Sequence, residues 1–446
     1  MLSNMEHDDK ISKIKKFIPE SLTRRIRPIF HYLVAIYGAV RYKFPSRRIL
    51  VVAVTGTKGK TTTTELVNAI LEEAGYKTAL ASTLRFKIGD GSERNLFKMT
   101  MPGRSFLQNF LREAVDNKCD WAVIEMTSEG AEQYRHKFIS LDALIFTNIS
   151  PEHIESHGSY EKYLEAKLSI AKSLEKSWKK NKVLVVNKDS QDADKFLASN
   201  IEKKVAYTIG DAKPFTLKEE SSELNIFRER INTKLAGEFN AYNILSAAMF
   251  AKSQNISPQT IKDAIEKFNG VPGRLEKVIV DPSNFPKEVR HKFPGGRIEP
   301  PYTVIVDYAH TADSLEKLYG VFPNSKKICV LGSCGGGRDK WKRSEMGKVA
   351  ATHCDSIILT NEDPYDEDPL EIINDVAKGV GRRKYRVIVD RREAIRTAIA
   401  EAKKGNVILI TGKGTDPYIM GPNDSKEPWS DYEVAAEEIL RAMKLS

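Results

Sequence analysis

The chain of 446 residues contains little that would suit a secreted, disulfide-rich or membrane-spanning protein. It has four cysteines (Cys119, Cys329, Cys334 and Cys354) and no C-x-x-C pair, so we expect neither a zinc ribbon nor a disulfide framework. No apolar run approaches the roughly 20 residues of a membrane span, and the charged N-terminus is unlike a signal peptide. These absences favour a globular protein of a reducing cytoplasm, with two or three domains in a chain of this length.

Positive charge is concentrated at the N-terminus. The formal net charge is +10, and residues 1–48 hold 11 Lys or Arg against 4 Asp or Glu. Within them, residues 26–46 form an apolar, aromatic, helix-like stretch with basic flanks. This stretch is either a peripheral contact with an anionic membrane surface or a helix packed on the next domain with its charges in solvent, and we favour the second. Nucleic acid is not an expected partner, because no recognised binding module accompanies the charge.

Apolar strands alternate with helices over most of the remaining chain. The first half predicts strands at 49–55, 121–126, 143–148 and 182–187 and helices at 61–74, 105–117 and 160–176. A Gly-Val-Pro-Gly turn at 270–273 predicts a hinge, and beyond it we expect strands at 302–307, 327–331, 356–359, 386–389 and 407–411, with a long loop at 281–301. The pattern predicts an α/β fold with mainly parallel sheets. In such sheets ligands lie at the carboxyl ends of the strands.

Residues 51–64, V-V-A-V-T-G-T-K-G-K-T-T-T-T, have the order of a phosphate-binding loop. Gly56 and Gly59 would let backbone N–H groups turn toward phosphate oxygens, Lys60 would supply a cation, and Thr61 would offer a hydroxyl to Mg²⁺. Val54 stands where the first Gly of the full G-x-x-x-x-G-K-T pattern would be. The alternative is a plain glycine turn between a strand and a helix. We infer that the chain binds ATP.

Further candidate residues lie after predicted strands or in a predicted helix. Glu125 ends a strand and would suit a hard cation held beside phosphate. His153 and His157 follow the next strand, and Lys167 lies in the helix after them. Taken singly, each histidine would more often be a hydrogen-bonded loop residue, and Lys167 a solvated lysine.

Taken together, these segments resemble the Mur ligase family, most closely its MurE branch, from about Arg48 to the C-terminus. The resemblance rests on motifs in a fixed order: G-T-K-G-K-T-T-T, E-M-T-S-E-G-A-E-Q-Y-R, T-N-I-S-P-E-H, H-G-S-Y-E-K-Y-L-E-A-K, G-E-F-N-A-Y-N, G-V-P-G-R-L-E, V-D-Y-A-H-T, G-G-R-D-K-W-K-R and G-K-G. It implies a central P-loop ATP-binding domain at 49–272 and a C-terminal Rossmann-like α/β domain at 273–446. A short, basic, amphipathic helical extension would occupy residues 1–48.

The resemblance also implies roles for individual residues. ATP would be bound by Gly56, Thr57, Lys58, Gly59, Lys60, Thr61, Thr62, Asn240, Asn243, Asp307 and His310. Two Mg²⁺ ions would be bound by Thr61, Glu125, His153 and Lys167, the last carbamylated by CO₂ because a bare ammonium could not approach the metals. Lys60 and Arg274 would neutralise charge during catalysis. The acceptor peptide would contact Thr100, Thr127, Gln133 and Arg135, and the amino acid Arg338, Asp363, Tyr365, Gly412 and Asp416.

The activity implied is ATP-dependent amide-bond formation in peptidoglycan biosynthesis, by a monomer in the cytoplasm. A substrate carboxylate would be phosphorylated, and an amino group would then attack the acyl phosphate, in a site closed against water. One alternative is a related ligase, such as a folylpolyglutamate synthetase or a lipid II amidating subunit, acting on a lipid-linked or non-muramyl carboxylate. Another is a non-catalytic ATP-binding scaffold, against which the retained Glu125, His153 and Lys167 speak.

The sequence departs from the family pattern in two regions that govern the substrate. Members that use UDP-linked acceptors carry a UDP-binding domain before the phosphate loop, where this sequence has about 48 residues. Diaminopimelate-adding members have D-N-P-R where this chain has Glu362-Asp-Pro-Tyr365, and G-K-G-H-E where it has Gly412-Lys-Gly-Thr-Asp416. Loss of the arginine removes a bidentate clamp for a distal carboxylate. Acidic residues nearby would tolerate a cationic amino acid such as lysine, and the alternative is that they form a solvated acidic loop; they are Asp363, Asp366, Glu367 and Asp368.

Overall fold

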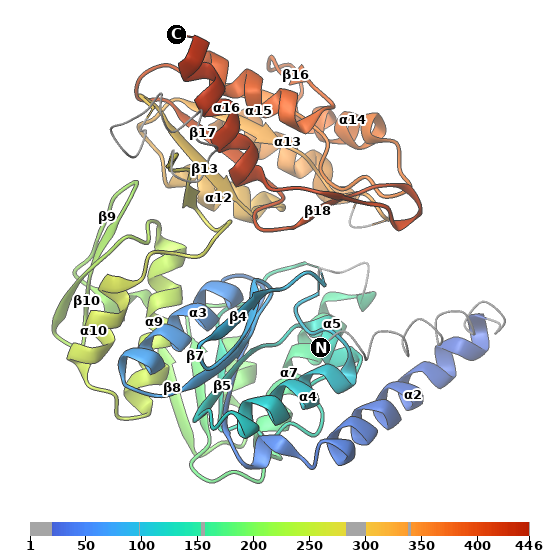
Figure 1. Ribbon diagram of the computed structural model, residues 1–446, viewed down its shortest axis with the longest axis vertical. Coiled ribbons are helices and arrows are strands. Elements are labelled where there is room, and N and C mark those ends of the chain that lie inside the picture. The colour runs from blue at the N-terminus through green and yellow to red at the C-terminus, as the bar shows by residue number, and fades with distance from the viewer. Residues whose placement is uncertain (1–19, 98, 153–156, 282–299, 338–339, 446) are drawn as a thin grey trace.

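The computed structural model describes residues 20–97, 99–152, 157–281, 300–337 and 340–445 (Figure 1). The predicted site residues His153 and Arg338, and most of the predicted loop at 281–301, lie outside these ranges. The described chain is built around two large sheets, one in each half (Figure 1). The predicted α/β class with mainly parallel sheets is confirmed.

The first sheet has eight strands in the order β4-β3-β2-β5-β1-β6-β7-β8. From β2 to β8 neighbouring strands are parallel, and β3 and β4 extend one edge as antiparallel strands. Their bounds are β1 Leu50–Thr55, β2 Thr78–Ala81, β3 Arg85–Ile88, β4 Gly91–Arg94, β5 Trp121–Glu125, β6 Ala143–Phe146, β7 Val183–Asn187 and β8 Lys203–Tyr207. The runs of Val, Ile, Leu and Ala in β1, β5 and β6 are buried throughout, apart from Leu50, as a sheet covered on both faces requires.

Helices cover both faces of this sheet. One face carries α4 (Arg104–Asp116), α5 (Ser128–Glu132), α7 (Tyr160–Glu175) and α8 (Ala193–Leu197), packed through one apolar cluster. The other carries α3 (Lys60–Glu73), α9 (Glu238–Ser253) and α10 (Pro258–Lys267), packed through a second. A small antiparallel sheet of β9 (Thr216–Leu217), β10 (Ser222–Ile226) and β11 (Glu229–Thr233) lies beside α10.

The second sheet has six strands in the order β12-β13-β17-β14-β15-β16, and only β12 is antiparallel to its neighbour. Their bounds are β12 Glu276–Lys277, β13 Thr303–Asp307, β14 Lys327–Leu331, β15 Ser356–Leu359, β16 Arg386–Val387 and β17 Val407–Thr411. One face is covered by α12 (Ala312–Gly320), α13 (Trp341–His353) and α14 (Pro369–Val380), and the other by α15 (Arg391–Glu401) and α16 (Asp431–Leu445). A hairpin of β18 (Tyr418–Met420) and β19 (Lys426–Pro428) follows β17.

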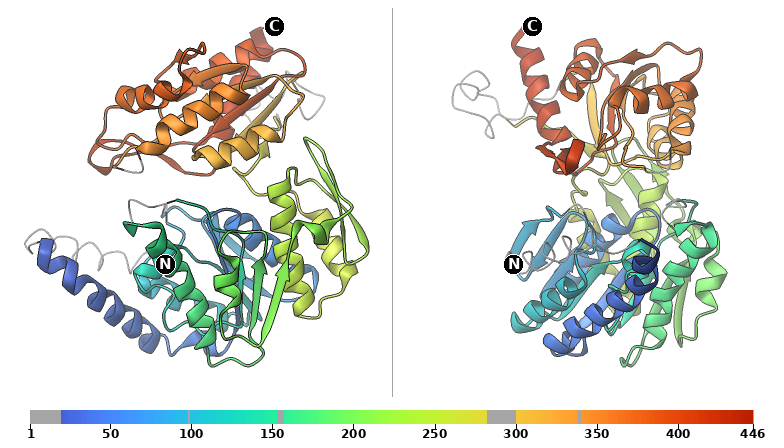
Figure 2. Two further views of the ribbon diagram at one scale, coloured as in Figure 1. Left: turned by 180° about the vertical axis from the view of Figure 1, so that it is seen from behind. Right: turned by 90° about the vertical axis from the view of Figure 1, so that its right-hand side faces the viewer.

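The N-terminal helix α2 (Glu20–Arg41) packs on α4 and extends beyond the first sheet, as the two views of Figure 2 show. A short 3₁₀ helix at Pro45–Arg47 connects it to β1. No helix in the described ranges is long and apolar enough to cross a membrane.

One expectation from composition is wrong. Cys329 in β14 and Cys354, just before β15, form a disulfide with an S–S distance of 2.06 Å and a Cα–Cα distance of 6.1 Å. Both side chains are fully buried between the second sheet and its helices. Spacing alone could not reveal this pair, because the two cysteines lie 25 residues apart and meet only when β14 and β15 align.

Candidate active site

The phosphate-binding loop joins β1 to α3 and requires glycine at two positions. A Cβ on Gly56 would lie 2.0 Å from Thr147 Oγ1, and a Cβ on Gly59 would lie 2.1 Å from Asn243 Oδ1. Gly59 also has a left-handed backbone, with φ of 78° at the N-cap of α3. Lys60 Nζ donates to the Thr57 carbonyl oxygen at 3.0 Å. Burial lowers the pKa of Lys60, while Glu125 and Glu152 act in the opposite direction.

Glu125 ends β5 beside this loop. Its carboxylate is buried and accepts hydrogen bonds from Thr61 Oγ1 at 3.1 Å and from the Thr83 backbone N–H at 2.9 Å. Thr83 Oγ1 also lies 2.7 Å from Thr100 Oγ1. The predicted pair Thr61 and Glu125 therefore meet. Thr83 was missed, because it stands after a short strand that the sequence pattern did not indicate.

Lys167 reaches the loop from α7. Its Nζ donates to the Gly56 carbonyl oxygen at 2.7 Å and lies 4.7 Å from the centre of the Tyr163 ring. The side chain is buried, so the alternative of a solvated lysine is wrong. Burial first, and then the charge of Lys60, lower the pKa of Lys167 well below its usual value. A buried amine with a depressed pKa is available in its neutral, nucleophilic form.

Glu152 connects the loop to the second sheet. Its Oε1 lies 2.6 Å from Lys58 Nζ and 3.7 Å from His310 Nε2. Lys58 Nζ also donates to Thr311 Oγ1, the N-cap of α12, at 3.0 Å. Glu152 was missed as a site residue, although it stands within the T-N-I-S-P-E-H motif. Its carboxylate holds together groups from both halves of the chain.

Three predicted residues of the second half meet near the carboxyl end of β13, which Arg274 approaches from the turn before β12. The Arg274 guanidinium lies 4.1 Å from the centre of the Tyr308 ring. Asp307 accepts hydrogen bonds from the backbone N–H groups of Leu275 at 2.6 Å and Ala309 at 2.7 Å, and burial raises the pKa of this carboxyl. Burial lowers the pKa of His310 well below its usual value, which favours the neutral imidazole.

Two other predicted residues, Asn240 and Asn243, lie on the first turns of α9. Asn240 Nδ2 donates to the Ala236 carbonyl oxygen at 2.8 Å, and Asn243 Nδ2 donates to Asn240 Oδ1 at 3.1 Å. Asn243 stands directly behind Gly59. These amides therefore line the site and also support the backbone of the phosphate loop.

The four predicted acceptor residues line the same cavity as Glu125. Thr100 bonds to Thr83, and Thr127 caps α5 by accepting from the Gly130 N–H at 3.1 Å. Arg135 Nη2 donates to Gln133 Oε1 at 2.8 Å, and its Nη1 donates to the Met101 carbonyl oxygen. A substrate carboxylate would find one arginine and several hydroxyl or amide donors here.

The predicted amino-acid residues are only partly brought together. Asp363 and Asp416 lie near the buried Lys413 Nζ, at 2.7 and 3.5 Å, and Gly412 begins the same loop. Tyr365 packs against Gly336 and does not line the cavity described below. Of the other acids named from the sequence, Glu367 pairs with Arg343 at 3.0 Å. Asp366 accepts from the Asn423 N–H, and Asp368 caps α14. These acids therefore have structural partners.

Glu362 is the acid here that could bind a cationic side chain, a role that the sequence analysis gave to the acids after it. It is 4% exposed, and its Oε2 atom has no hydrogen-bond partner. Oε2 would lie 2.6 Å from a Cβ on Gly412, so the carboxylate stands against the glycine loop. Burial raises the pKa of Glu362, and the charge of Asp363 acts in the same direction. The residue could have been found from the E-D-P-Y motif, but the unpartnered oxygen is visible only in three dimensions.

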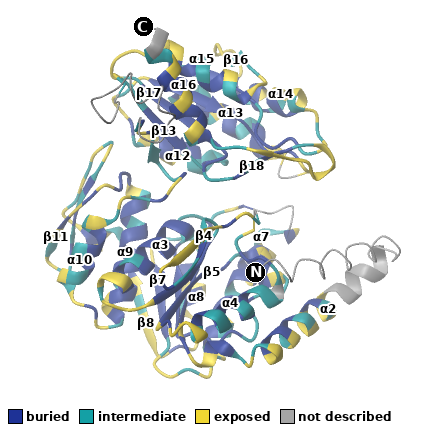
Figure 3. Ribbon diagram, in the orientation of Figure 1, coloured by how far each residue is buried: buried dark blue, intermediate teal, exposed yellow. Residues whose placement is uncertain are grey.

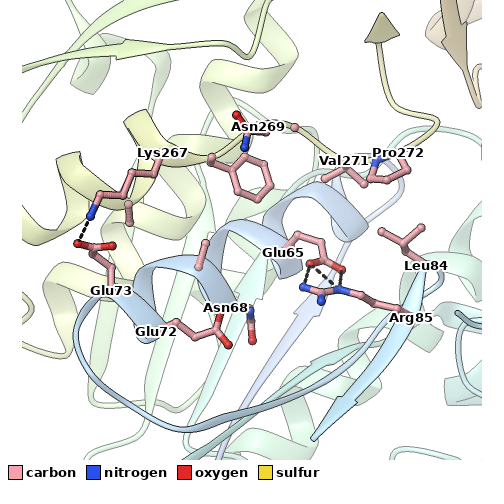
Figure 4. Close-up of a pocket in the computed structure, with 14 residues that line it drawn as sticks. Glu65, Asn68, Glu72, Glu73, Leu84, Arg85, Lys267, Asn269, Val271 and Pro272 are labelled. Carbon is pink, nitrogen blue, oxygen red and sulfur yellow. Dashed lines mark hydrogen bonds and ion pairs between the residues drawn. The ribbon is translucent and has the colours of Figure 1, made fainter. Parts of the chain in front are cut away.

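One cavity of about 1450 Å³ is lined by all the described residues that were predicted to bind ATP, metal, acceptor or amino acid, except Tyr365. Its lining includes the phosphate loop, Glu125, Lys167, the acceptor cluster, Arg274, His310 and Glu362. A second cavity, of about 640 Å³, lies between α3 and residues 264–272 (Figure 4). Its charged groups pair with each other, as in Glu65 with Arg85 and Glu73 with Lys267, so we assign no ligand to it (Figure 4).

The sequence matches two known domains that together cover most of these residues. Residues 54–251 match the Mur ligase middle domain, and residues 295–414 match the glutamate ligase domain of Mur ligases. A UDP-N-acetylmuramoyl-L-alanyl-D-glutamate–2,6-diaminopimelate ligase from Syntrophomonas wolfei is 36% identical over 92% of this chain and 82% of its own length. The ligase of the same name from Bacillus velezensis is 33% identical over 96% and 85%.

Solved structures agree with the sequence relatives. A ligase with the same diaminopimelate-adding description matches with a TM-score of 0.58 and 26% identity, over 89% of this chain and 79% of its own. A folylpolyglutamate synthase from Mycobacterium tuberculosis, complexed with ADP, has a TM-score of 0.65 and 15% identity over 85% and 91%, which shows a shared fold. From these matches, the chain belongs to the Mur ligase family, as its ordered motifs predicted.

Proposed function

We propose that this chain is an ATP-dependent ligase that joins an amino acid to a carboxylate of a peptidoglycan-type precursor peptide. The observation that carries the proposal is the convergence of Lys60, Glu125 and Lys167 on the phosphate loop, in a cavity that extends to a second polar cluster at Glu362. A nucleotide-binding scaffold would need the loop but not a buried lysine at its first glycine. The domain boundaries at 48 and 272 belong to the same proposal.

The residues at the loop fit Mg²⁺ bound beside phosphate. Thr61 Oγ1 and the Glu125 carboxylate are hard oxygen donors that lie 3.1 Å apart. The metal would polarise phosphate oxygens and offset their charge. His153 is proposed as a ligand of a second ion from the resemblance alone.

We assign to Lys167 a carbamate formed with CO₂. The neutral amine attacks carbon, an N–C bond forms, and the proton leaves, so that a cation becomes an anionic oxygen ligand. The depressed pKa of Lys167 favours this reaction because only the unprotonated amine is nucleophilic. Burial would also shield the carbamate from solvent protons.

The reaction then needs two substrate pockets on either side of the γ-phosphate. An acceptor carboxylate in the cluster around Arg135 attacks the γ-phosphorus, and the bond to ADP breaks. The incoming amine then attacks the acyl carbon, loses a proton, and inorganic phosphate leaves. Lys60 and Arg274 offset the charge that develops, and closure of the two halves over the substrates would keep out water that hydrolyses the acyl phosphate.

The amino acid that fits the second pocket has a cationic side chain, and lysine is our candidate. Glu362 offers a buried, unpartnered carboxylate oxygen, and the arginine that would bind a distal carboxylate is replaced by Tyr365. An ammonium group would satisfy this oxygen, whereas a second carboxylate would be repelled by it. Glu362 thus replaces the four acids named from the sequence as the proposed binding residue for the cationic side chain.

The test is phosphate release from ATP and Mg²⁺ with bicarbonate present. Amino acids are scanned against UDP-linked and lipid-linked muramyl dipeptides. Turnover with either acceptor supports the ligase, and the preferred acceptor identifies the handle that it recognises. Binding of ATP with no phosphate release under any combination would sink the proposal and favour the scaffold.

A further inference from the structure

Helix α2 exposes a long apolar face. Residues 28–40 contain no Asp, Glu, Lys or Arg. Four large side chains spaced along one side of this segment are mostly exposed: Ile29 at 62%, Leu33 at 57%, Tyr37 at 60% and Val40 at 57%. Figure 3 shows exposed positions recurring along α2. A surface helix of a globular protein normally turns charged or polar residues toward water. The composition of this face therefore calls for a non-aqueous contact.

The opposite face fixes the helix to the protein. His31, Ala35, Gly38 and Ala39 are buried on that side. A Cβ on Gly38 would lie 3.2 Å from Ser105 Cα in α4, so the two helices approach closely. The Tyr32 ring also packs edge-on against Tyr134 and Phe138, at 5.9 and 5.4 Å between ring centres. The favoured prediction of a packed helix thus accounts for one face and leaves the other without a partner among the described residues.

Basic side chains surround the C-terminal end of this face. Arg41, Lys43, Arg47 and Arg48 are all exposed. The Arg47 guanidinium lies 4.5 Å from the centre of the Phe44 ring and 4.6 Å from that of Trp178. Trp178 is itself 78% exposed, and the exposed Lys176 and Lys180 are its near neighbours in sequence. Exposed tryptophan with arginine and lysine is the composition of a membrane interface.

We propose that α2 binds the surface of an anionic lipid bilayer, with Ile29, Leu33, Tyr37 and Val40 inserted among the acyl chains. The headgroups are contacted by basic side chains that the negative surface of the bilayer attracts: Arg41, Lys43, Arg47, Arg48 and Lys180. The helix lies in the interface and does not span it. A second copy of the chain fits less well, because basic residues flank the apolar segment at both ends, so a two-fold contact in either direction would bring like charges together. They are Arg24, Arg25 and Arg27 before it and Arg41 and Lys43 after it. The proposal does not depend on the ligase reaction.

Flotation of the full-length protein with vesicles tests this assignment. Vesicles of phosphatidylcholine are compared with vesicles that contain about one third phosphatidylglycerol. We expect binding to the anionic vesicles that is at least tenfold tighter than to the neutral ones and weakens in high salt. The emission of Trp178 should shift to shorter wavelength on binding, and this shift should vanish in Trp178→Phe.

Matched variants separate the helix from general stickiness. Leu33→Ser with Tyr37→Ser should abolish binding, and Lys43→Glu with Arg48→Glu should abolish the preference for anionic lipid. The control Leu370→Ser removes a side chain that is 47% exposed on α14 and should bind like the parent. Circular dichroism and phosphate release show that each variant is folded. Equal binding by the Leu33/Tyr37 variant would overturn the proposal. Failure of the parent protein to bind vesicles would also overturn it. This holds if the parent is a monomer, and also if it forms a dimer that the Leu33/Tyr37 substitutions dissociate.

Discussion

Lys58 Nζ lies 3.0 Å from Thr311 Oγ1, so the phosphate loop of the first sheet is hydrogen-bonded to the first turn of a helix on the second. The same ammonium lies 2.6 Å from Glu152, which stands 3.7 Å from His310. One lysine thus links the two halves of the site before any nucleotide is considered.

Replacing Lys58 with Met should loosen the contact between the two halves of the chain. A hydrogen bond that involves a charged group contributes about 1.5–3 kcal/mol, and Lys58 makes one to Glu152 and one to Thr311. We expect a larger radius of gyration in small-angle scattering without nucleotide, and a raised KM for ATP. The control is Lys180→Met, an exposed lysine in the first half. An unchanged radius would show that other contacts, such as Arg94 Nη2 to the Thr415 carbonyl oxygen at 2.8 Å, suffice.

Lys167→Ala should reduce turnover at least 100-fold, because the proposed carbamate is an essential metal ligand in the reaction. Short carboxylic acids such as formate should restore part of the activity by supplying the missing oxygen donor. Lys172→Ala, an exposed lysine on the same helix, should behave like the parent. Loss of activity without rescue, in a variant that is folded and binds ATP, would argue that the amine itself is needed.

Glu362→Gln should lower kcat/KM for lysine by about 10- to 100-fold, the equivalent of losing one charged hydrogen bond. The ATP KM should change little. In the parent enzyme, kcat/KM for lysine should fall as the pH drops through the raised pKa of Glu362, because the protonated carboxyl no longer attracts an ammonium. A parent enzyme that prefers diaminopimelate to lysine contradicts the assignment.

The same substitution should stabilise the free protein. The pKa of Glu362 is raised in the folded state, so the folded protein binds more protons than the unfolded chain between the two pKa values. The stability of the parent therefore falls as the pH rises through that interval, and the cost is fully present above it. We expect Glu362→Gln to raise Tm at pH 7.5 and the difference to shrink on acidification. Glu367→Gln, which removes a partner of Arg343, should instead lower Tm at pH 7.5.

Cys354→Ser should lower the free energy of unfolding by about 3 kcal/mol, since the disulfide closes a loop of 25 residues in the unfolded chain. Thermal unfolding with and without a strong reductant measures the effect. Under denaturing, non-reducing conditions, thiol labelling should detect Cys119 and Cys334 only. Labelling of all four cysteines in the purified protein would show that the pair stays reduced.

The sequence predicted most of the fold because the central strands are continuous apolar runs. The predicted strands at 49–55, 143–148 and 327–331 correspond to β1, β6 and β14. Strands β3 and β4 were missed because Arg85–Ile88 and Gly91–Arg94 are short and polar, and half-exposed edge strands have no apolar run. In the hairpin that was also missed, β18 is apolar but only three residues long, and β19 is polar and exposed.

Site residues that directly follow a strand could be predicted from the sequence. Those whose role depends on contacts between distant segments of the chain could not. Glu125 could be found because it ends β5. The roles of Glu152 and Glu362 depend on neighbours that lie far away in the sequence. Glu152 pairs with Lys58, which also bonds to Thr311, and Glu362 stands against Gly412. Whether a given acid is paired is a property of the packed structure. For that reason Asp366, Glu367 and Asp368 could not be distinguished from Glu362 by composition.

The contact of Tyr32 with Tyr134 and Phe138 places α2 on the segment that also holds Gln133 and Arg135. Any surface that takes up the outer side of α2 is therefore at a set height from the acceptor pocket. With the position of α2 fixed in this way, the protein would select its acceptor by the distance between the bilayer and the reactive carboxylate. Molecules whose reactive carboxylate stands at the matching distance from the bilayer would enter. Shorter or longer ones would be excluded by distance, even where their carboxylate suits the cluster around Arg135.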